Sequence, residues 1–172
     1  MVSPERAPGG AALGIAAGVP DPELPMVTLA DLGILREVRE DGDTVTVVIT
    51  PTYSGCPAMR EISRDLRRRL HQAGYRCVTV QTELAPAWSS DWITAEGRRK
   101  LAAAGIAPPN PATRRPPGGP VPLTLTAPGR AVTCPRCGSA RTRETSPFSA
   151  TACKALYRCE QCLEPFEYVK EI

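Results

Sequence analysis

The chain has 172 residues, of which 42% are hydrophobic and 23% charged, and its formal net charge is +3. This composition is typical of a soluble globular protein with room for one ordinary domain and a smaller one. The charge is too weak to predict a nucleic-acid or anionic-membrane partner, and the apolar runs are shorter than a bilayer-spanning helix. We expect a cytoplasmic protein with no nucleic-acid and no membrane partner.

The first residues are rich in alanine, glycine and proline. A weak signal peptide is one interpretation, but the run has no strong apolar block and carries Glu5 beside Arg6. We interpret residues 1–10 as a flexible N-terminal tail that leads into a short helix.

A short helical turn is predicted within residues 20–33, which also hold three prolines. Thr28 is placed to cap this turn, and Gly33 is placed to close it in a left-handed conformation.

A β-hairpin follows this turn. The strand-like segments 34–40 and 43–50 flank Asp41-Gly42, which is a strong two-residue turn signal. Alternation along the second strand puts three apolar side chains on one face: Val45, Val47 and Ile49.

An amphipathic helix comes next, because apolar residues recur three, four and four positions apart at Met59, Ile62, Leu66 and Leu70. The other face of this helix is basic, and we interpret it as a solvated surface: Arg60, Arg64, Arg67, Arg68 and Arg69. The one histidine of the chain, His71, lies at the helix end, where we also expect a solvated side chain. A single histidine excludes the zinc and iron sites that need two.

The last elements of this domain are a strand over 76–84 and a second helix over 94–104. Cys77 is on the strand and is expected in the core. Thr94 is the expected cap of the helix, and Gly105 its stop. Two tryptophans in the intervening loop are expected to anchor that loop: Trp88 and Trp92.

These elements predict an α+β domain over 11–106, with packed helices and a small mixed β-sheet. Eight prolines between 107 and 128 cannot form a compact element, so we predict a semi-extended Pro-rich linker there. The linker separates the α+β domain from a cysteine-rich tail over 129–172.

The tail contains two Cys-x-x-Cys pairs separated by residues 138–158, which is the pattern of a zinc-ribbon β structure. Four thiolates would close a tetrahedral, structural Zn²⁺ site and supply the stability that so small a tail lacks. A rubredoxin-like iron site would use the same ligands: Cys134, Cys137, Cys159 and Cys162. Cys153 lies outside both pairs and is interpreted as a small buried residue. The odd total of seven cysteines argues against a disulfide framework.

Cys56 lies in the sequence YSGCP, just before the amphipathic helix. Pro57 suits the first helical position, which puts Cys56 at the N-cap, where free N–H groups and the helix dipole favour a thiolate. A thiolate is a nucleophile and a ligand for soft metals. The alternative is a buried cysteine that caps and packs.

Two motifs carry a family resemblance. DPELPMVTLADLGIL at 21–35 and TPTYSGCP at 50–57, with the helix after them, resemble the iron–sulfur carrier and assembly family that includes SufT. With PAWSSDWIT at 86–94 and the cysteine-rich tail, the whole chain is similar to the D-subunit family of bacterial phenylacetyl-CoA epoxidase systems.

The resemblance implies an accessory factor, not an enzyme, that assists assembly of an iron–sulfur cluster or iron centre. Its partners would be the oxygenase or reductase subunits of phenylacetyl-CoA 1,2-epoxidase in aerobic phenylacetate degradation, together with a cluster donor. Cys56 matches the family's characteristic cysteine and would handle the metal. Five further residues match the two motifs and would support it: Asp21, Glu23, Asp31, Thr50 and Thr52.

Cys56 cannot hold a cluster alone, because such clusters usually take four thiolates. A bound cluster would need a homodimer, ligands from a partner or an exogenous thiol, so we expect transient transfer. Three alternatives stay open: a structural adaptor that binds an epoxidase component through the zinc ribbon, a thiol enzyme, and a nucleic-acid-binding ribbon. No base for a thiol enzyme is visible, since His71 lies at the far end of the helix.

Overall fold

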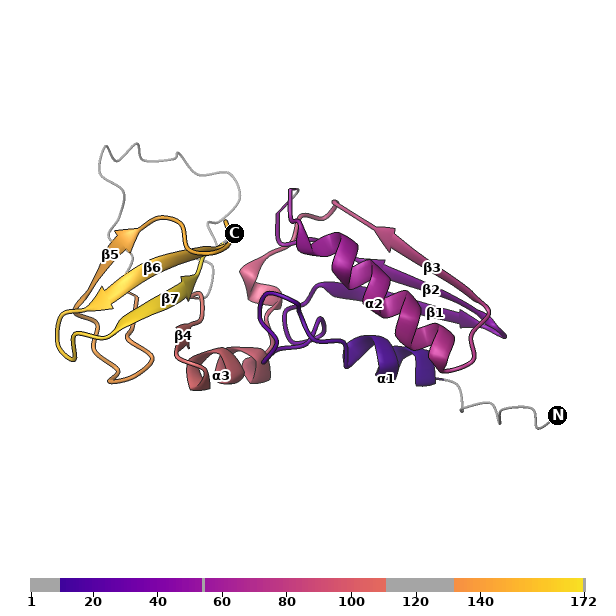
Figure 1. The fold of residues 1–172 in the computed structure, drawn as a ribbon, viewed down its shortest axis with the longest axis horizontal. Helices are drawn as coiled ribbons and strands as arrows, with labels where there is room; N and C mark the ends of the chain where they lie inside the picture. Colours follow the sequence, from indigo (N-terminus) through magenta and orange to yellow (C-terminus); the bar gives the residue numbers. More distant parts are fainter. Residues whose placement is uncertain (1–9, 54, 111–131, 172) are drawn as a thin grey trace, which may run out of the picture. The chain divides into compact units, whose positions relative to one another are not determined.

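The structure is a computed structural model that describes residues 10–53, 55–110 and 132–171. The expected tail before residue 10, most of the expected linker and the first residues of the expected ribbon lie outside the described residues. The described residues form two compact units that divide between Leu101 and Ala102, here called the N-terminal and C-terminal units (Figure 1).

The sheet of the N-terminal unit has three strands in the order β1-β2-β3 (Figure 1). β1 (Leu35–Asp41) and β2 (Thr44–Ile49) form an antiparallel hairpin. β3 (Cys77–Thr82) runs parallel to β2, to which it is connected through the helix α2 (Ala58–Gln72). The predicted mixed sheet with packed helices is confirmed.

The hairpin turn lies one residue later than predicted. Asp41 pairs with Thr44, so Gly42 and Asp43 are the two turn residues. The φ of Gly42 is +59°, which a glycine adopts without the penalty that a Cβ atom would bring. Asp41 extends the first strand because its backbone completes the ladder to Thr44.

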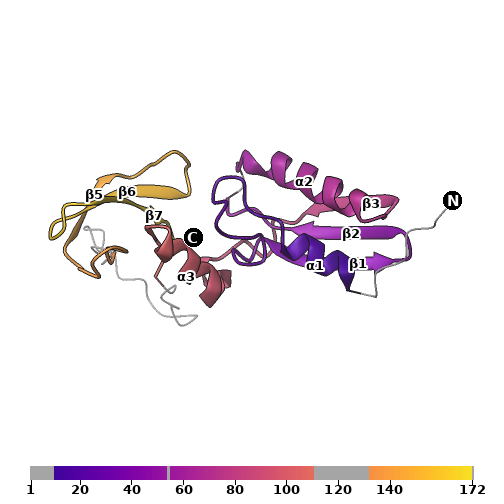
Figure 2. The same cartoon turned by 60° about the horizontal axis from the view of Figure 1, so that its bottom comes forward.

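Helices α1 (Ala11–Ala17) and α2 contact each other and cover one face of the sheet (Figures 1 and 2). Three side chains of β2 alternate onto that face and are fully buried: Val45, Val47 and Ile49. The predicted apolar stripe of α2 is confirmed, because Ile62, Leu66 and Leu70 are buried and Met59 is half-buried.

The remaining face of α2 is solvated, as expected. Arg64 pairs with Glu61, and Arg69 pairs with Asp65 at 2.8 Å, both within the helix. His71 is exposed, and its Nδ1 lies 2.9 Å from the carbonyl oxygen of Tyr75.

Cys77 is exposed, which corrects the expectation that it lies in the core. Successive strand residues point to opposite faces, and Cys77 points away from α2 together with Thr79 and Gln81. Their neighbours Val78 and Val80 point toward α2 and are half-buried. Strand propensity located the element, but only the register decided which side chains it buries.

The loops that precede β1 and follow β2 and β3 meet at one edge of the sheet. The Thr50 N–H donates to the Ile34 carbonyl at 2.9 Å, and the Glu83 N–H donates to the Ile49 carbonyl at 2.9 Å. Trp88 is buried and its Nε1–H donates to the Leu32 carbonyl at 2.9 Å, so its anchoring role is confirmed. Trp92 is half-buried beneath the guanidinium of Arg36, which lies 3.7 Å from the ring centre.

The caps predicted around the two shorter helical segments are present. The Thr28 hydroxyl accepts a hydrogen bond from the Asp31 N–H at 3.1 Å, and Gly33 follows with a φ of +67°. The Thr94 hydroxyl accepts from the Gly97 N–H at 2.9 Å at the start of α3 (Ala95–Ala103), and Gly105 after it has a φ of +80°.

The sheet of the C-terminal unit has four strands in the order β4-β7-β6-β5. β5 (Thr142–Ser146), β6 (Lys154–Cys159) and β7 (Pro165–Val169) are antiparallel neighbours, and the short β4 (Ile106–Ala107) runs parallel to β7. Its small core includes three aromatic side chains: Tyr157, Phe166 and Tyr168. The ring centres of Tyr157 and Tyr168 are 5.4 Å apart in an edge-to-face arrangement, which adds to the stability of so small a core.

The unit boundary differs from the one expected at residue 106. Ile106 and Ala107 pair with Glu167 and Tyr168, so they extend the sheet of the C-terminal unit. Ala107 was expected to begin the linker, but it is buried in the core of this unit. A two-residue strand has no periodicity of its own, and only its distant partner makes it a strand.

Cys153 is half-buried rather than fully buried. It lies directly before β6, and its carbonyl accepts a hydrogen bond from the Lys170 N–H at 2.9 Å. Among the helices of the described ranges, none combines the length and the apolar character needed to cross a membrane.

Candidate functional site

Two tight turns of the C-terminal unit carry the four cysteines of the predicted zinc site. Cys134 and Cys137 are in the turn before β5, where the Gly138 N–H donates to the Cys134 carbonyl at 2.9 Å. Cys159 ends β6 and Cys162 lies in the turn between β6 and β7, where the Cys159 N–H donates to the Glu164 carbonyl at 3.0 Å. The strands therefore hold the two turns against each other.

The four sulfur atoms lie within 4.8 Å of one another. The distance between the sulfurs of Cys134 and Cys162 is 3.8 Å, and that between Cys137 and Cys159 is 3.6 Å. A tetrahedral zinc with Zn–S bonds of about 2.3 Å requires sulfur separations of about 3.8 Å. The geometry fits one four-thiolate zinc ion, and four protein ligands leave no open position for catalysis.

The electrostatics of the thiol cluster also favour a cation. The backbone N–H of Cys162, assisted by that of Gln161, lowers the pKa of Cys159 to about 6. Two opposing effects act on Cys162. A backbone hydrogen bond with Glu164 lowers its pKa, whereas desolvation and the three neighbouring sulfurs raise it, and the net result is a pKa of about 12. Four sulfurs at this spacing cannot all become thiolates unless a cation balances their charge.

The residue after each Cys-x-x-Cys pair has a left-handed backbone conformation. Gly138 has a φ of +71° in the first turn, and Leu163 has a φ of +65° in the second. Glycine adopts this conformation readily, whereas a side chain with a Cβ atom is strained there. The Leu163 side chain is 59% exposed, so burial does little to offset the strain.

We expect Leu163→Gly to stabilise the metal-bound ribbon by about 1 kcal/mol, because it removes the strain and loses little buried surface. The apparent zinc affinity should rise about fivefold. The zinc affinity of each protein is measured by competition with a chromophoric chelator. The matched control is Gly138→Leu, which should change the affinity in the opposite direction, since a Cβ there meets no atom within 4 Å and adds only backbone strain. Equal affinities for all three proteins would contradict the strain argument.

Cys56 lies in the loop between β2 and α2. Helix α2 begins at Ala58, and Pro57 before it has helical φ and ψ of −68° and −24°. The helix assignment puts Pro57 at the cap and Cys56 one residue before it, but the helical dihedrals of Pro57 are those expected of a proline at the first helical position. Its N–H donates to the Tyr53 carbonyl at 3.2 Å, its carbonyl accepts from the Met59 N–H at 3.4 Å, and its side chain is half-buried.

The two acidic residues at the start of the first motif have different surroundings. Asp21 is 6% exposed, and its Oδ1 accepts the N–H groups of Glu23 and Leu24, each at 2.9 Å. It therefore braces the turn that begins the loop before β1. Glu23 is exposed.

Asp31 braces the same loop. It is 8% exposed, and its Oδ2 accepts from the Thr28 N–H at 2.9 Å and from the Lys100 ammonium at 2.7 Å. Burial raises the pKa of the Asp31 carboxyl, but Lys100 and the two Thr28 groups outweigh burial and hold the pKa below its ordinary value. Sequence reasoning missed Lys100, because a lysine on an exposed helix carries no local signal of a partner 69 positions away.

Thr50 and Thr52 begin the loop that contains Cys56. Thr50 is 2% exposed, and its N–H holds the loop to Ile34. Thr52 is half-buried. The sheet pairing therefore places both motifs at the same edge, as loops that precede β1 and follow β2.

Cys56 and the acidic residues do not form a group of three or more metal ligands in the described part of the chain, whereas the four ribbon cysteines do. Cys77 cannot complete such a group within one chain. It pairs with Thr44 at the start of β2, whereas the loop that contains Cys56 follows the other end of this strand, and the two ends of β2 are about 16 Å apart.

The matches to known proteins extend over both units. Residues 13–81 match the family described as "Iron-sulfur cluster assembly protein", and residues 118–170 match the "PaaD zinc beta ribbon domain". A curated relative from Escherichia coli (strain K12) is the D subunit of a "Putative 1,2-phenylacetyl-CoA epoxidase". It is 41% identical over 155 residues, which are 88% of this chain and 86% of that protein.

Two solved structures are similar to this chain, but less so than the Escherichia coli protein. A "Domain of Unknown Function DUF59 from Bacillus anthracis" is 24% identical with a TM-score of 0.49, over 54% of this chain and 89% of that one. The "Conserved Hypothetical Protein TM0487 from Thermotoga maritima" is 24% identical with a TM-score of 0.47, over 56% and 95%. Both TM-scores are too low to assign a function.

The match to the Escherichia coli protein extends over both units and includes the iron–sulfur assembly and zinc-ribbon segments. Such extended identity is a property of the whole chain, not of one motif. The chain belongs to the D-subunit family of phenylacetyl-CoA epoxidases.

Proposed function

We propose that this chain is an accessory factor of the phenylacetyl-CoA 1,2-epoxidase system in aerobic phenylacetate degradation. It assists assembly of the iron–sulfur cluster or iron centre of an oxygenase or reductase subunit, and Cys56 handles the metal transiently. The observation that carries the proposal is the position of Cys56, half-exposed before α2, in the segment that matches the iron–sulfur cluster assembly family.

The chemistry of Cys56 suits brief contact rather than storage. One thiolate supplies one of the ligands that a cluster needs, and within the described residues of the N-terminal unit the second cysteine, Cys77, lies at the opposite end of the sheet. The remaining ligands would come from the donor, the client, a second copy of the chain or a small thiol. A weakly held cargo is released readily, which a delivery factor requires.

The zinc ribbon has a separate role in this proposal. Its four-thiolate site is closed, so zinc would hold the C-terminal unit together and take no part in transfer. Cys134, Cys137, Cys159 and Cys162 are the ligands.

Cys56→Ala tests the proposal. The client subunits are produced with wild-type chain, with Cys56→Ala or with no chain, and iron and sulfide are measured per client. We expect the variant to lower client iron to the level reached without the chain. Iron, sulfide and zinc are also measured per chain after anaerobic purification, and zinc should be unchanged. The matched control is Cys77→Ala, which removes an exposed thiol at the other end of the sheet. A client that contains as much iron with Cys56→Ala as with the wild-type chain would contradict the metal-handling role of Cys56.

A structural adaptor is the second candidate. The closed zinc site favours it, because a metal without an open position serves folding and docking rather than chemistry. An adaptor predicts that Cys56→Ala is silent and that Cys159→Ser abolishes binding to an epoxidase component. The Cys56 experiment therefore separates the two candidates.

A further inference from the structure

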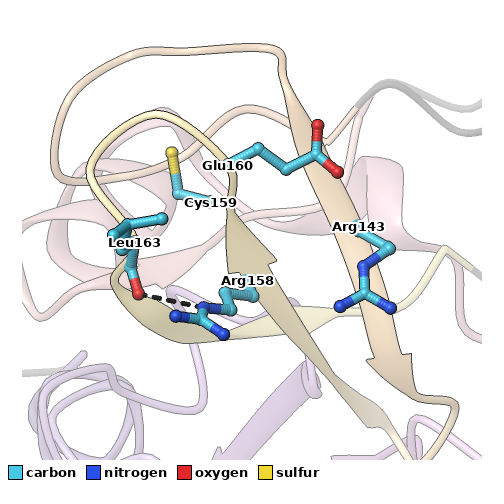
Figure 3. Close-up of a pocket in the computed structure, with 5 residues that line it drawn as sticks. All are labelled: Arg143, Arg158, Cys159, Glu160 and Leu163. Carbon is cyan, nitrogen blue, oxygen red and sulfur yellow. Dashed lines mark hydrogen bonds between the residues drawn. The ribbon is translucent and has the colours of Figure 1, made fainter.

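A shallow pocket of about 320 Å³ lies on the C-terminal unit, and Cys159 is the zinc ligand that lines it. Its other lining residues are Arg143 from β5, Arg158 from β6, and Glu160 and Leu163 from the second cysteine turn (Figure 3). Neither family resemblance nor zinc binding accounts for these four side chains.

The two arginines are an unusual pair. Arg143 and Arg158 are directly opposite in the antiparallel ladder between β5 and β6, so their side chains lie on the same face. Like charges opposite each other destabilise a sheet. Both side chains are exposed, and within the described ranges no carboxylate lies at ion-pair distance from either one. Lys154 of the same unit, by contrast, pairs with Glu167 at 2.8 Å.

Leu163 is a second feature of this pocket that the stability of the fold does not explain. Its strained backbone conformation would suit glycine, as at Gly138, yet it carries an apolar side chain that is 59% exposed. The Arg158 Nε–H donates to the Leu163 carbonyl at 3.3 Å, which fixes the turn beside the cationic pair (Figure 3). Strain held at an exposed position points to a role in contact with another molecule.

We propose that Arg143, Arg158 and Leu163 form a docking surface for an acidic protein segment. A carboxylate of that segment bridges the two guanidiniums, and an adjacent apolar side chain packs on Leu163. Glu160 at the same pocket disfavours a polyanion, because its carboxylate would face a phosphate backbone. A single carboxylate beside an apolar side chain meets less repulsion from Glu160 than a run of phosphates does, and it complements Arg143, Arg158 and Leu163.

This inference deepens the proposed function and rests on it for the choice of partner, which is an oxygenase or reductase subunit of the epoxidase. Binding of the full zinc-loaded chain to each purified subunit is measured by biolayer interferometry. We expect Arg143→Ala/Arg158→Ala to weaken binding about tenfold or more and to flatten its salt dependence. Leu163→Gly should weaken binding while it raises zinc affinity, a combination that a merely structural role does not produce.

The matched control is Arg64→Ala/Arg67→Ala, which removes the same charge from the solvated face of α2 in the other unit and should leave binding unchanged. The zinc content of every variant is measured to verify that its zinc ribbon is folded. Wild-type affinity in the Arg143→Ala/Arg158→Ala protein, or no binding of the wild-type chain to either subunit, would overturn the docking surface. The Cys56 experiment would stand unaffected by either result.

Nucleic acid is the competing occupant. A labelled single strand and a duplex of about 20 nucleotides are tested on the same proteins. Suppose that the chain binds the single strand or the duplex through Arg143 and Arg158 and does not bind the epoxidase subunits. This result would assign the surface to nucleic acid and overturn the protein-docking proposal.

Discussion

Cys159→Ser is expected to abolish zinc binding and to unfold the C-terminal unit. Cys159 is fully buried, and its sulfur accepts the N–H groups of Gln161 and Cys162 while it lies 3.6 Å from the Cys137 sulfur. The aromatic core of this unit is small, and a structural zinc site contributes on the order of 10 kcal/mol to folding. Loss of one thiolate therefore removes more stability than the unit possesses.

The two units can be followed separately in this experiment. Both tryptophans, Trp88 and Trp92, belong to the N-terminal unit, so their fluorescence reports that unit alone. We expect zinc per chain to fall from about one to about zero and protease cleavage to appear within the C-terminal unit. The tryptophan unfolding transition should not move. The matched control is Cys153→Ser, which changes a thiol outside the quartet. Retained zinc and protection in Cys159→Ser would contradict a site of four required thiolates.

Asp31→Asn should destabilise the N-terminal unit by about 2 kcal/mol at pH 7. The carboxylate is buried and accepts from Lys100 and Thr28, so the amide loses the ion pair and leaves the ammonium with only the exposed Glu96, 4.0 Å away. Lys100 is 31% exposed, which keeps the cost below that of a fully buried pair.

The effect has a defined pH dependence. The pKa of Asp31 is lower in the folded chain than in the unfolded chain, whose carboxyl titrates near its ordinary value of about 3.9. Its stabilising contribution is complete above that ordinary value and is lost as the pH falls through the folded pKa. The difference between wild type and Asp31→Asn should therefore be constant near neutrality and shrink below about pH 4.

Urea unfolding followed by tryptophan fluorescence at several pH values measures this difference. Glu96→Gln is the matched control, because the exposed Glu96 lies 4.0 Å from the same ammonium and should matter little. A difference that stays constant down to about pH 3 would show that Asp31 acts through packing and not through its charge.

Much of the fold could be predicted from local sequence. The apolar spacing of α2, the cap at Thr94 and the turn closed by Gly33 depend on neighbours within a few positions, and each is present. The two cysteine pairs were recognisable for the same reason, because a Cys-x-x-Cys turn is itself local.

Several outcomes that differed from the prediction depend on strand pairing, which joins residues that local sequence patterns do not relate. Cys77 is exposed because the register with β2 turns it away from α2. Ile106 and Ala107 are a strand because β7 lies beside them, and the hairpin turn moved by one residue because Asp41 pairs with Thr44.

The sequence by itself determined the order of the main elements of the N-terminal domain, the four candidate zinc ligands and the family resemblance, since these depend on spacing and residue type along the chain. The tertiary structure alone decided that Lys100 pairs with Asp31, that four sulfurs lie within 4.8 Å, and that Arg143 and Arg158 share a face beside a strained Leu163. Such contacts join residues whose separation in the chain carries no periodic signal, so only the packing and strand register of the folded chain bring them together.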